Sequence, residues 1–316
     1  MNNIKLNYQF FFVKFPIIFP LIYGIVLFQF PSLETILIIT TIFLLAETHF
    51  AATWPFFLDK INYPFIIQNR IALIVSPILI IILSLLGFFF FNKFFLLTFL
   101  AINMYHVTRQ SFGVCKLYSK NPEENKFQEK LIYFFNLIFF LFAFLKFYLP
   151  IINEKNIFII NTILIILFIG ICFFYLFRFK FSENFLTFLT GCLIFSPVLF
   201  VNNPVHVITM GVTMHYTQYL YLTYNVYNFR KSSLVLKSSE NILKKISGFL
   251  IIIIIYSFFM TFFSFSHKFT EFNIKNLLLI PLIGQMLHFY LDSQLWKFSE
   301  KYNRDNTLVH LTNFIK

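Results

Sequence analysis

Four histidines interrupt long apolar stretches of this sequence and are the strongest candidates for chemistry. They are His49, His106, His215 and His288. Neutral imidazole is the commonest metal ligand in proteins, and a set of imidazoles without thiolates suits Fe(II), Cu or Zn. A single buried histidine is more often hydrogen-bonded between helices than bound to a metal. A metal centre therefore requires that the four histidines meet.

Other polar residues recur beside these histidines at the spacing of one helix face. The recurring residues form three groups: Asn103, His106, Arg109 and Gln110; His215, Gln218, Tyr219 and Asn225; and Gln285, His288 and Asp292. Polar side chains in hydrocarbon face the interior of a helix bundle. A ligating imidazole also needs an acceptor for its second nitrogen, and Asp292, Glu47 or Gln218 could supply one.

Glu47 does not share a helix face with the nearest histidine. It lies two residues before His49, which turns it about 160° away on an ideal helix. We therefore expect either a second polar contact at Glu47 or a distorted helix.

The elements that carry these residues are predicted to be transmembrane helices. The chain is 59% apolar and 12% charged, and runs such as Ile71–Phe91 hold roughly 20 residues without a charge, enough to cross a bilayer. We predict an all-α polytopic membrane protein with a single integral membrane domain, 1–316. The expected spans are Phe10–Gln29, Glu34–Phe57, Ile71–Phe91, Phe94–Cys115, Leu131–Leu149, Ile157–Phe179, Glu183–Val201, Val205–Asn228, Ile246–Ser266 and Lys275–Trp296.

The basic residues predict the orientation of these ten helices. Of the 25 lysines and arginines, 18 fall on the side of the termini and five on the other side. By the positive-inside rule both termini are cytoplasmic, so the net charge of +12 reflects topology and we set nucleic acid aside. We expect the first apolar stretch to remain as a helix, and a multi-pass protein of the plasma (inner) membrane.

The orientation gives each of the four histidines a depth. All four lie on helices that run from outside to inside, about 12, 14, 20 and 12 Å from the cytoplasmic helix ends. They are therefore predicted to form one layer, which favours a metal centre. The remaining histidines, His206, His267 and His310, are predicted at the surface. The three cysteines are interpreted as apolar fillers without disulfides; they are Cys115, Cys172 and Cys192.

Short motifs around these histidines resemble those of the Brp/Blh family of membrane β-carotene 15,15′-dioxygenases. His288-Phe-Tyr-Leu-Asp292 is similar to the family's His-x-x-x-Asp near the C-terminus, and His106-Val-Thr-Arg109 is similar in placement to its second histidine motif. The stretch 214–219 lies where the family has His-x-x-x-His, with Tyr219 in place of the second histidine. Glu47-Thr-His49 stands in place of the family's opening Pro-His-Gly-x-x-Asp.

The resemblance implies a non-haem iron enzyme that cleaves a carotenoid or acts on another hydrophobic lipid or isoprenoid. Its Fe(II) would be held by His49, His106, His215 and His288, with dioxygen at an open position and the substrate entering from the membrane lipids. Around the iron, the candidate catalytic residues would be Glu47, Gln218, Tyr219 and Asp292, with Arg109 to neutralise charge or gate entry.

Three alternatives remain open at this stage. Another transition metal or haem could replace Fe(II), although the four histidines at one depth favour a single non-haem centre. A proton-coupled transporter could use the same intramembrane histidine, arginine and aspartate residues. A structural subunit would hold them as buried hydrogen-bonded pairs.

Overall fold

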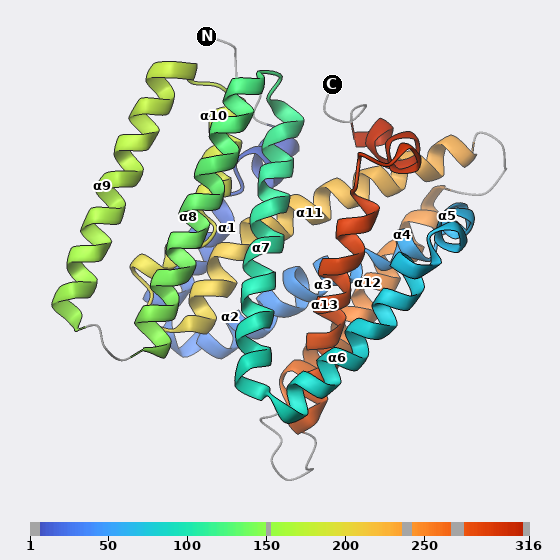
Figure 1. Cartoon of the computed structure of the whole chain (residues 1–316), viewed down its shortest axis with the longest axis horizontal. Helices are drawn as coiled ribbons and strands as arrows, with labels where there is room; N and C mark the ends of the chain where they lie inside the picture. The colour runs from blue at the N-terminus through green and yellow to red at the C-terminus, as the bar shows by residue number, and fades with distance from the viewer. Residues whose placement is uncertain (1–6, 150–152, 236–241, 267–274, 312–316) are drawn as a thin grey trace. The chain divides into compact units, whose positions relative to one another are not determined.

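All regular structure in the described part of the chain is helical. The computed structural model describes residues 7–149, 153–235, 242–266 and 275–311. Its elements are α-helices (Figure 1) and short 3-10 or π turns, which the text names η. The all-α prediction is confirmed. Four helices are long and apolar enough to cross a membrane: Pro31–Phe57, Ile71–Phe90, Pro122–Tyr148 and Glu154–Phe179. The ten spans and the cytoplasmic termini stay predictions.

The described residues group into two compact units, each built from two stretches of chain. The first unit takes its residues from Met1–Ile38 and Met104–Gln218, and the second from Ile39–Asn103 and Tyr219–Lys316. Three helices are divided between the units: α2 (Glu34–Thr41), α7 (Asn92–Tyr118) and α11 (Pro204–Val235). The chain thus passes between the units within helices, and each unit is described by itself below.

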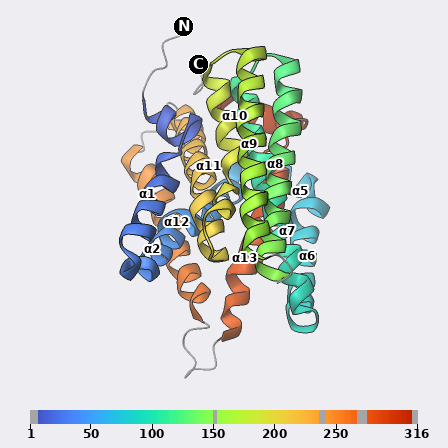
Figure 2. The same cartoon turned by 90° about the vertical axis from the view of Figure 1, so that its left-hand side faces the viewer.

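The first unit is dominated by long helices. Besides its parts of α2, α7 and α11 it contains η1 (Phe10–Lys14), α1 (Ile18–Gln29), η2 (Pro31–Leu33), α8 (Pro122–Tyr148), α9 (Glu154–Phe179), α10 (Glu183–Leu193) and η6 (Ser196–Leu199). Figure 2 shows α8, α9 and α10 side by side. The sequence sets the start of α8, because the Asn121 side chain accepts hydrogen bonds from the backbone N–H groups of Glu123 and Glu124, a strong N-cap.

A buried carboxylate connects the helices of the first unit. Glu124 of α8 is 5% exposed, and it accepts hydrogen bonds from the Ser119 hydroxyl, the Tyr175 hydroxyl of α9 and the Asn184 amide of α10. Tyr175 also stacks on Phe188, with ring centroids 4.8 Å apart. Three donors compensate the loss of water around this carboxylate, so the contact stabilises the unit.

The first unit also requires a glycine where α11 meets the end of α10. The predicted helix Glu183–Val201 ends at Leu193, and Pro197, which cannot continue the helical hydrogen-bond pattern, follows in η6. Gly211 packs against the chain at this break, and a Cβ there would lie 1.7 Å from the Ile194 carbonyl oxygen. A side chain at position 211 is therefore incompatible with this packing.

The second unit contains many short elements. Besides its parts of α2, α7 and α11 they are η3 (Ile42–Ala46), α3 (Glu47–Ala51), α4 (Trp54–Phe57), η4 (Lys60–Asn62), α5 (Tyr63–Gln68), η5 (Ile71–Val75), α6 (Ser76–Phe90), α12 (Ile242–Ser264), η9 (Lys275–Leu278), α13 (Leu279–Leu295), α14 (Lys301–Asn303) and η10 (Arg304–Leu308). Helix α3 packs against α12 and α13, and α13 packs against α6.

The predicted span Glu34–Phe57 lies within the candidate membrane span Pro31–Phe57, but the chain breaks from a regular α-helix at two places in it. First, η3 is a π turn in which the backbone N–H of Glu47 bonds the carbonyl of Ile42, and the Ser257 hydroxyl of α12 donates to the Phe43 carbonyl of this turn. Second, the chain turns at Ala52 and Thr53, just before Pro55, which lacks a backbone N–H. Both breaks flank α3 and decide where its side chains point.

We expect Gly211→Ala to lower the free energy of unfolding by about 3 kcal/mol, because the added methyl group meets backbone that cannot move aside cheaply. Thermal unfolding of detergent-purified protein measures this. Gly113→Ala in α7 is the matched control, since nothing lies within 4 Å of a Cβ there, and it should be neutral or slightly stabilising. Equal unfolding midpoints for the two variants would contradict the packing.

Candidate metal centre

Two of the four candidate histidines meet in the second unit. His49 of α3 and His288 of α13 are fully buried, and their ring centroids lie 4.5 Å apart at an interplanar angle of 65°. The ring of Tyr219, on α11, lies 4.3 Å from His49. The tertiary structure thus brings together side chains from three elements that are far apart in the sequence.

Thr53 joins this group to Asp292 and was not predicted as a site residue. Its hydroxyl donates to Oδ1 of Asp292 at 2.7 Å and lies 2.7 Å from Nδ1 of His288. The hydroxyl of Tyr219 donates to the same Oδ1 at 2.7 Å. Thr53 and Asp292 are each 1% exposed, so water does not compete for these hydrogen bonds.

The hydrogen count in this network assigns the tautomer of His288. With Asp292 as a carboxylate, which only accepts, the single hydroxyl protons of Thr53 and Tyr219 both go to it. The Thr53 oxygen then accepts from Nδ1–H of His288, so Nε2 carries the lone pair. This nitrogen lies 3.7 Å from Asp292 Oδ2, too far for a hydrogen bond. An imidazole held in this way presents Nε2 as a ligand atom.

Local sequence explains how these residues reach one another. His288 and Asp292 lie four residues apart on α13, and so share a face. Thr53 follows His49 by the same spacing, but it lies in the turn before Pro55 rather than within a continuous helix. That spacing from a candidate histidine is the signal that could have identified Thr53.

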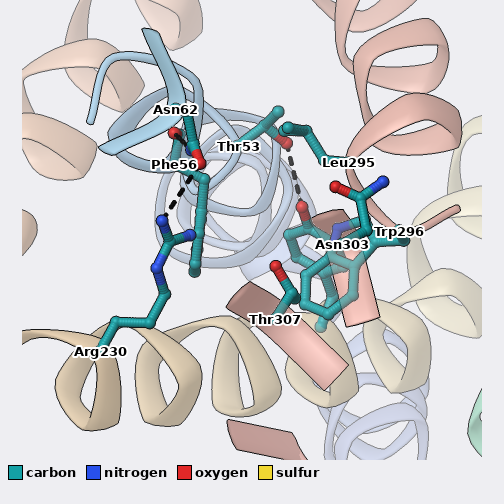
Figure 3. Close-up of a pocket in the computed structure, with 9 residues that line it drawn as sticks. Thr53, Phe56, Asn62, Arg230, Leu295, Trp296, Asn303 and Thr307 are labelled. Carbon is teal, nitrogen blue, oxygen red and sulfur yellow. Dashed lines mark hydrogen bonds between the residues drawn. The ribbon is translucent and has the colours of Figure 1, made fainter. Parts of the chain in front are cut away.

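A pocket opens beside Thr53 and Tyr219 in the second unit (Figure 3). Its lining residues are Thr53, Phe56, Asn62, Tyr219, Arg230, Leu295, Trp296, Asn303 and Thr307. The buried Arg230 donates to Asn62 at 3.2 Å and lies 3.7 Å from Asp59. Burial lowers the pKa of Arg230, and the Asp59 carboxylate opposes this shift. The pocket thus combines a buried arginine with aromatic and aliphatic side chains, and it borders the Asp292 network.

Glu47 makes a contact of the second unit that is separate from the Asp292 network. It is 1% exposed, and its Oε1 accepts a hydrogen bond of 3.3 Å from the Gln285 amide. The π turn η3 immediately precedes it. Both sequence expectations for Glu47, a second polar contact and a helix distortion, are thus found at this residue.

The other two candidate histidines meet in the first unit. His106 of α7 and His215 of α11 are buried, and their rings are perpendicular with centroids 5.9 Å apart. The amide of Gln218 donates to the Val13 carbonyl at 2.7 Å. Arg109 is exposed. Within this unit the histidines therefore pair, Gln218 ties α11 to η1, and Arg109 points away from the buried interior.

The prediction that His206 is a surface histidine is wrong. It is 2% exposed, and its ring nitrogens lie 2.7 Å from the Tyr23 hydroxyl and 2.7 Å from Glu34 Oε1 in the first unit. Pro204 starts α11 two residues earlier, so His206 lies in the first turn of this helix. His310 is half-buried, and His267 lies outside the described residues. The three cysteines are free thiols, as predicted.

Comparison with protein-family models, characterised proteins and solved structures found no match to this chain. The Brp/Blh resemblance therefore stays a prediction. Independently of it, the described residues include buried histidine and aspartate side chains that could hold a metal ion. The donors are imidazole nitrogens and carboxylate oxygens, a set that fits a transition metal such as Fe(II).

We expect Thr53→Val to lower the free energy of unfolding by about 1–3 kcal/mol, because the variant removes a buried hydroxyl from the Asp292 network and keeps its shape. Thermal unfolding in detergent measures the effect. Thr48→Val is the matched control, since that buried hydroxyl bonds backbone carbonyls of the preceding turn η3, at Leu44 and Leu45. A loss of stability no greater than that of the control would contradict the role of Thr53.

Proposed function

We propose that this protein is a metal-dependent membrane oxidoreductase that acts on a hydrophobic lipid or isoprenoid. The observation that carries the proposal is the buried pair His49 and His288, with His288 oriented by Thr53 and Asp292. Nδ1 of His288 bonds the Thr53 hydroxyl at 2.7 Å in this network, so the imidazole is held in one orientation with the lone pair on Nε2. Such orientation of an imidazole by a hydrogen-bonded carboxylate is typical of metal sites.

Fe(II) is the metal that we propose, with His49 and His288 as protein ligands in the second unit; His106 and His215 stay ligands that the sequence predicts. Imidazole and carboxylate donors without thiolate suit non-haem iron better than Cu(I) or an iron–sulfur cluster. Bound Fe(II) would supply redox chemistry with dioxygen, which side chains alone lack. The chain's contribution is a buried site from which bulk water is excluded and in which the ligands are held in one orientation.

The remaining residues have distinct proposed roles. Asp292 and Thr53 position His288, and Tyr219 holds Asp292 and packs against His49. The apolar exterior of the membrane-spanning helices suits a substrate that enters from the bilayer, and oxidative cleavage of a carotenoid is the narrower form of the proposal. Gln218 bonds the Val13 carbonyl and Arg109 is exposed, so we propose no direct role in the chemistry for either residue.

We expect detergent-purified protein to contain close to one equivalent of iron per chain and His288→Ala to retain less than about a tenth of it, because one ligand is lost. Elemental analysis measures the metal. His310→Ala is the control and should keep its iron, because His310 is not among the proposed ligands.

Folded protein that contains no metal would contradict the proposal. It would favour the second candidate, a proton-coupled transporter, which the buried Arg230 in the pocket beside Thr53 and Tyr219 supports. Uptake driven by a proton gradient in proteoliposomes would then identify it.

For the carotenoid form, we expect expression in a carotene-producing bacterium to bleach the pigment and to form retinal, and His288→Ala to do neither. Pigment absorbance and chromatography of cell extracts measure both. Unchanged pigment in cells that contain the folded, iron-loaded protein would show that the substrate is a different lipid.

A further inference from the structure

Of the polar atoms that are buried in the second unit without a hydrogen-bond partner among the described residues, three lie close together. They are Oε2 of Glu47, Nε1 of Trp54 and the hydroxyl oxygen of Tyr256. Leaving a buried polar atom unpaired costs about 1–3 kcal/mol, and folded proteins contain few such atoms. Three of them around one place indicate a group that binds there.

The three atoms belong to one neighbourhood. The Tyr256 hydroxyl interacts electrostatically with the Glu47 carboxyl group and approaches the Trp54 indole N–H without ordinary hydrogen-bond geometry. Helix α3, which carries Glu47, packs against α12, which carries Tyr256. On α13, Gln285 bonds the other oxygen of Glu47.

A glycine keeps space for the Tyr256 hydroxyl. A Cβ at Gly284 would lie 2.6 Å from this oxygen, closer than non-bonded contact allows. Gly284 has no side chain at the place where the Tyr256 hydroxyl lies, so the position of this hydroxyl depends on α13 as well as on α12.

The donor and acceptor types define the ligand. The Trp54 indole only donates a hydrogen bond, and so it repels a metal cation or an ammonium group. The Glu47 carboxyl group disfavours an anion. A hydroxyl group can accept from Trp54 and donate to Glu47, and it bonds the carboxyl group in either protonation state. The site therefore fits one neutral hydroxyl.

The surface around Tyr256 indicates where that hydroxyl comes from. Ile252 and Phe259 lie four residues before and three residues after Tyr256, on the same face of α12. Both are exposed, at 48% and 51%. The surface of α12 on either side of Tyr256 is therefore apolar, which suits a ligand with a long hydrocarbon chain better than water.

We propose that Glu47, Trp54 and Tyr256 bind the hydroxyl end of a long-chain alcohol that is dissolved in the bilayer. The inference rests on the general form of the proposed function, an enzyme that acts on a hydrophobic lipid or isoprenoid, and it narrows that substrate to one with a hydroxyl group, which carotene lacks. Glu47 anchors the lipid and does not touch the reacting atoms. Binding itself requires no metal, so it is tested separately from the metal centre.

The two tryptophans of the chain, Trp54 and Trp296, allow a direct test. In the Trp296→Phe background Trp54 is the sole tryptophan, and its fluorescence reports on the site. We expect metal-free protein in detergent to show a saturable change in Trp54 emission with farnesol, and no saturable change with farnesene, which has a similar chain without the hydroxyl.

The second arm removes one hydroxyl from the site. Tyr256→Phe in the same background should raise the Kd for farnesol about tenfold, the loss of one hydrogen bond of about 1.4 kcal/mol. Tyr224→Phe, a partly buried tyrosine of the same unit, should leave the Kd unchanged.

Several outcomes would overturn the proposal. Folded protein whose Trp54 emission ignores farnesol, or responds equally to farnesene, has no site for a lipid hydroxyl, and the buried atoms then bind water. An unchanged Kd in Tyr256→Phe would also reject it. Farnesol binding is measured on metal-free protein, so a negative result does not change the iron content expected under the proposed function. In the same way, absence of iron from the purified protein would not change the farnesol binding expected here.

Discussion

A polar side chain that is buried away from water must find a hydrogen-bond partner, and the described structure follows this requirement. In the second unit, Asp292 accepts from two hydroxyls at 2.7 Å each. In the first unit, Glu124 accepts from three donors on other elements. In such apolar surroundings, a polar group left without its partner costs more free energy than the same hydrogen bond contributes in water. The polar residues thus determine which helices pack together.

The same requirement connects the fold to the proposed chemistry. The Thr53 hydroxyl has one proton, which it donates to Asp292. The hydrogen bond between Thr53 and His288 therefore requires the proton on Nδ1 of His288. The lone pair on Nε2 is then a consequence of packing α3, α11 and α13 together. Where the requirement is not met, as at Glu47, Trp54 and Tyr256, the structure indicates a missing group. Satisfied and unsatisfied polar atoms therefore point to two different sites in one unit.

Some features of the site could be predicted from single helices. His288 and Asp292 share a face because they are four residues apart, and Tyr219 was identified from the polar spacing after His215. Thr53 has the same spacing from His49, but its contact with His288 depends on a chain turn and on α13, which lies more than 200 residues later. His206 was misinterpreted because its partners, Tyr23 and Glu34, lie on other elements.

The sequence by itself determined that the chain is helical, that several helices suit a bilayer and that histidines interrupt them, because composition and periodicity are local properties. Only the tertiary structure decided that Thr53 orients His288, that Glu47 faces Gln285 and that Gly211 must lack a side chain. Each of these depends on a contact between residues far apart in the sequence. Hydrogen-bond geometry and steric exclusion act between such neighbours in space, which no repeat along one helix encodes.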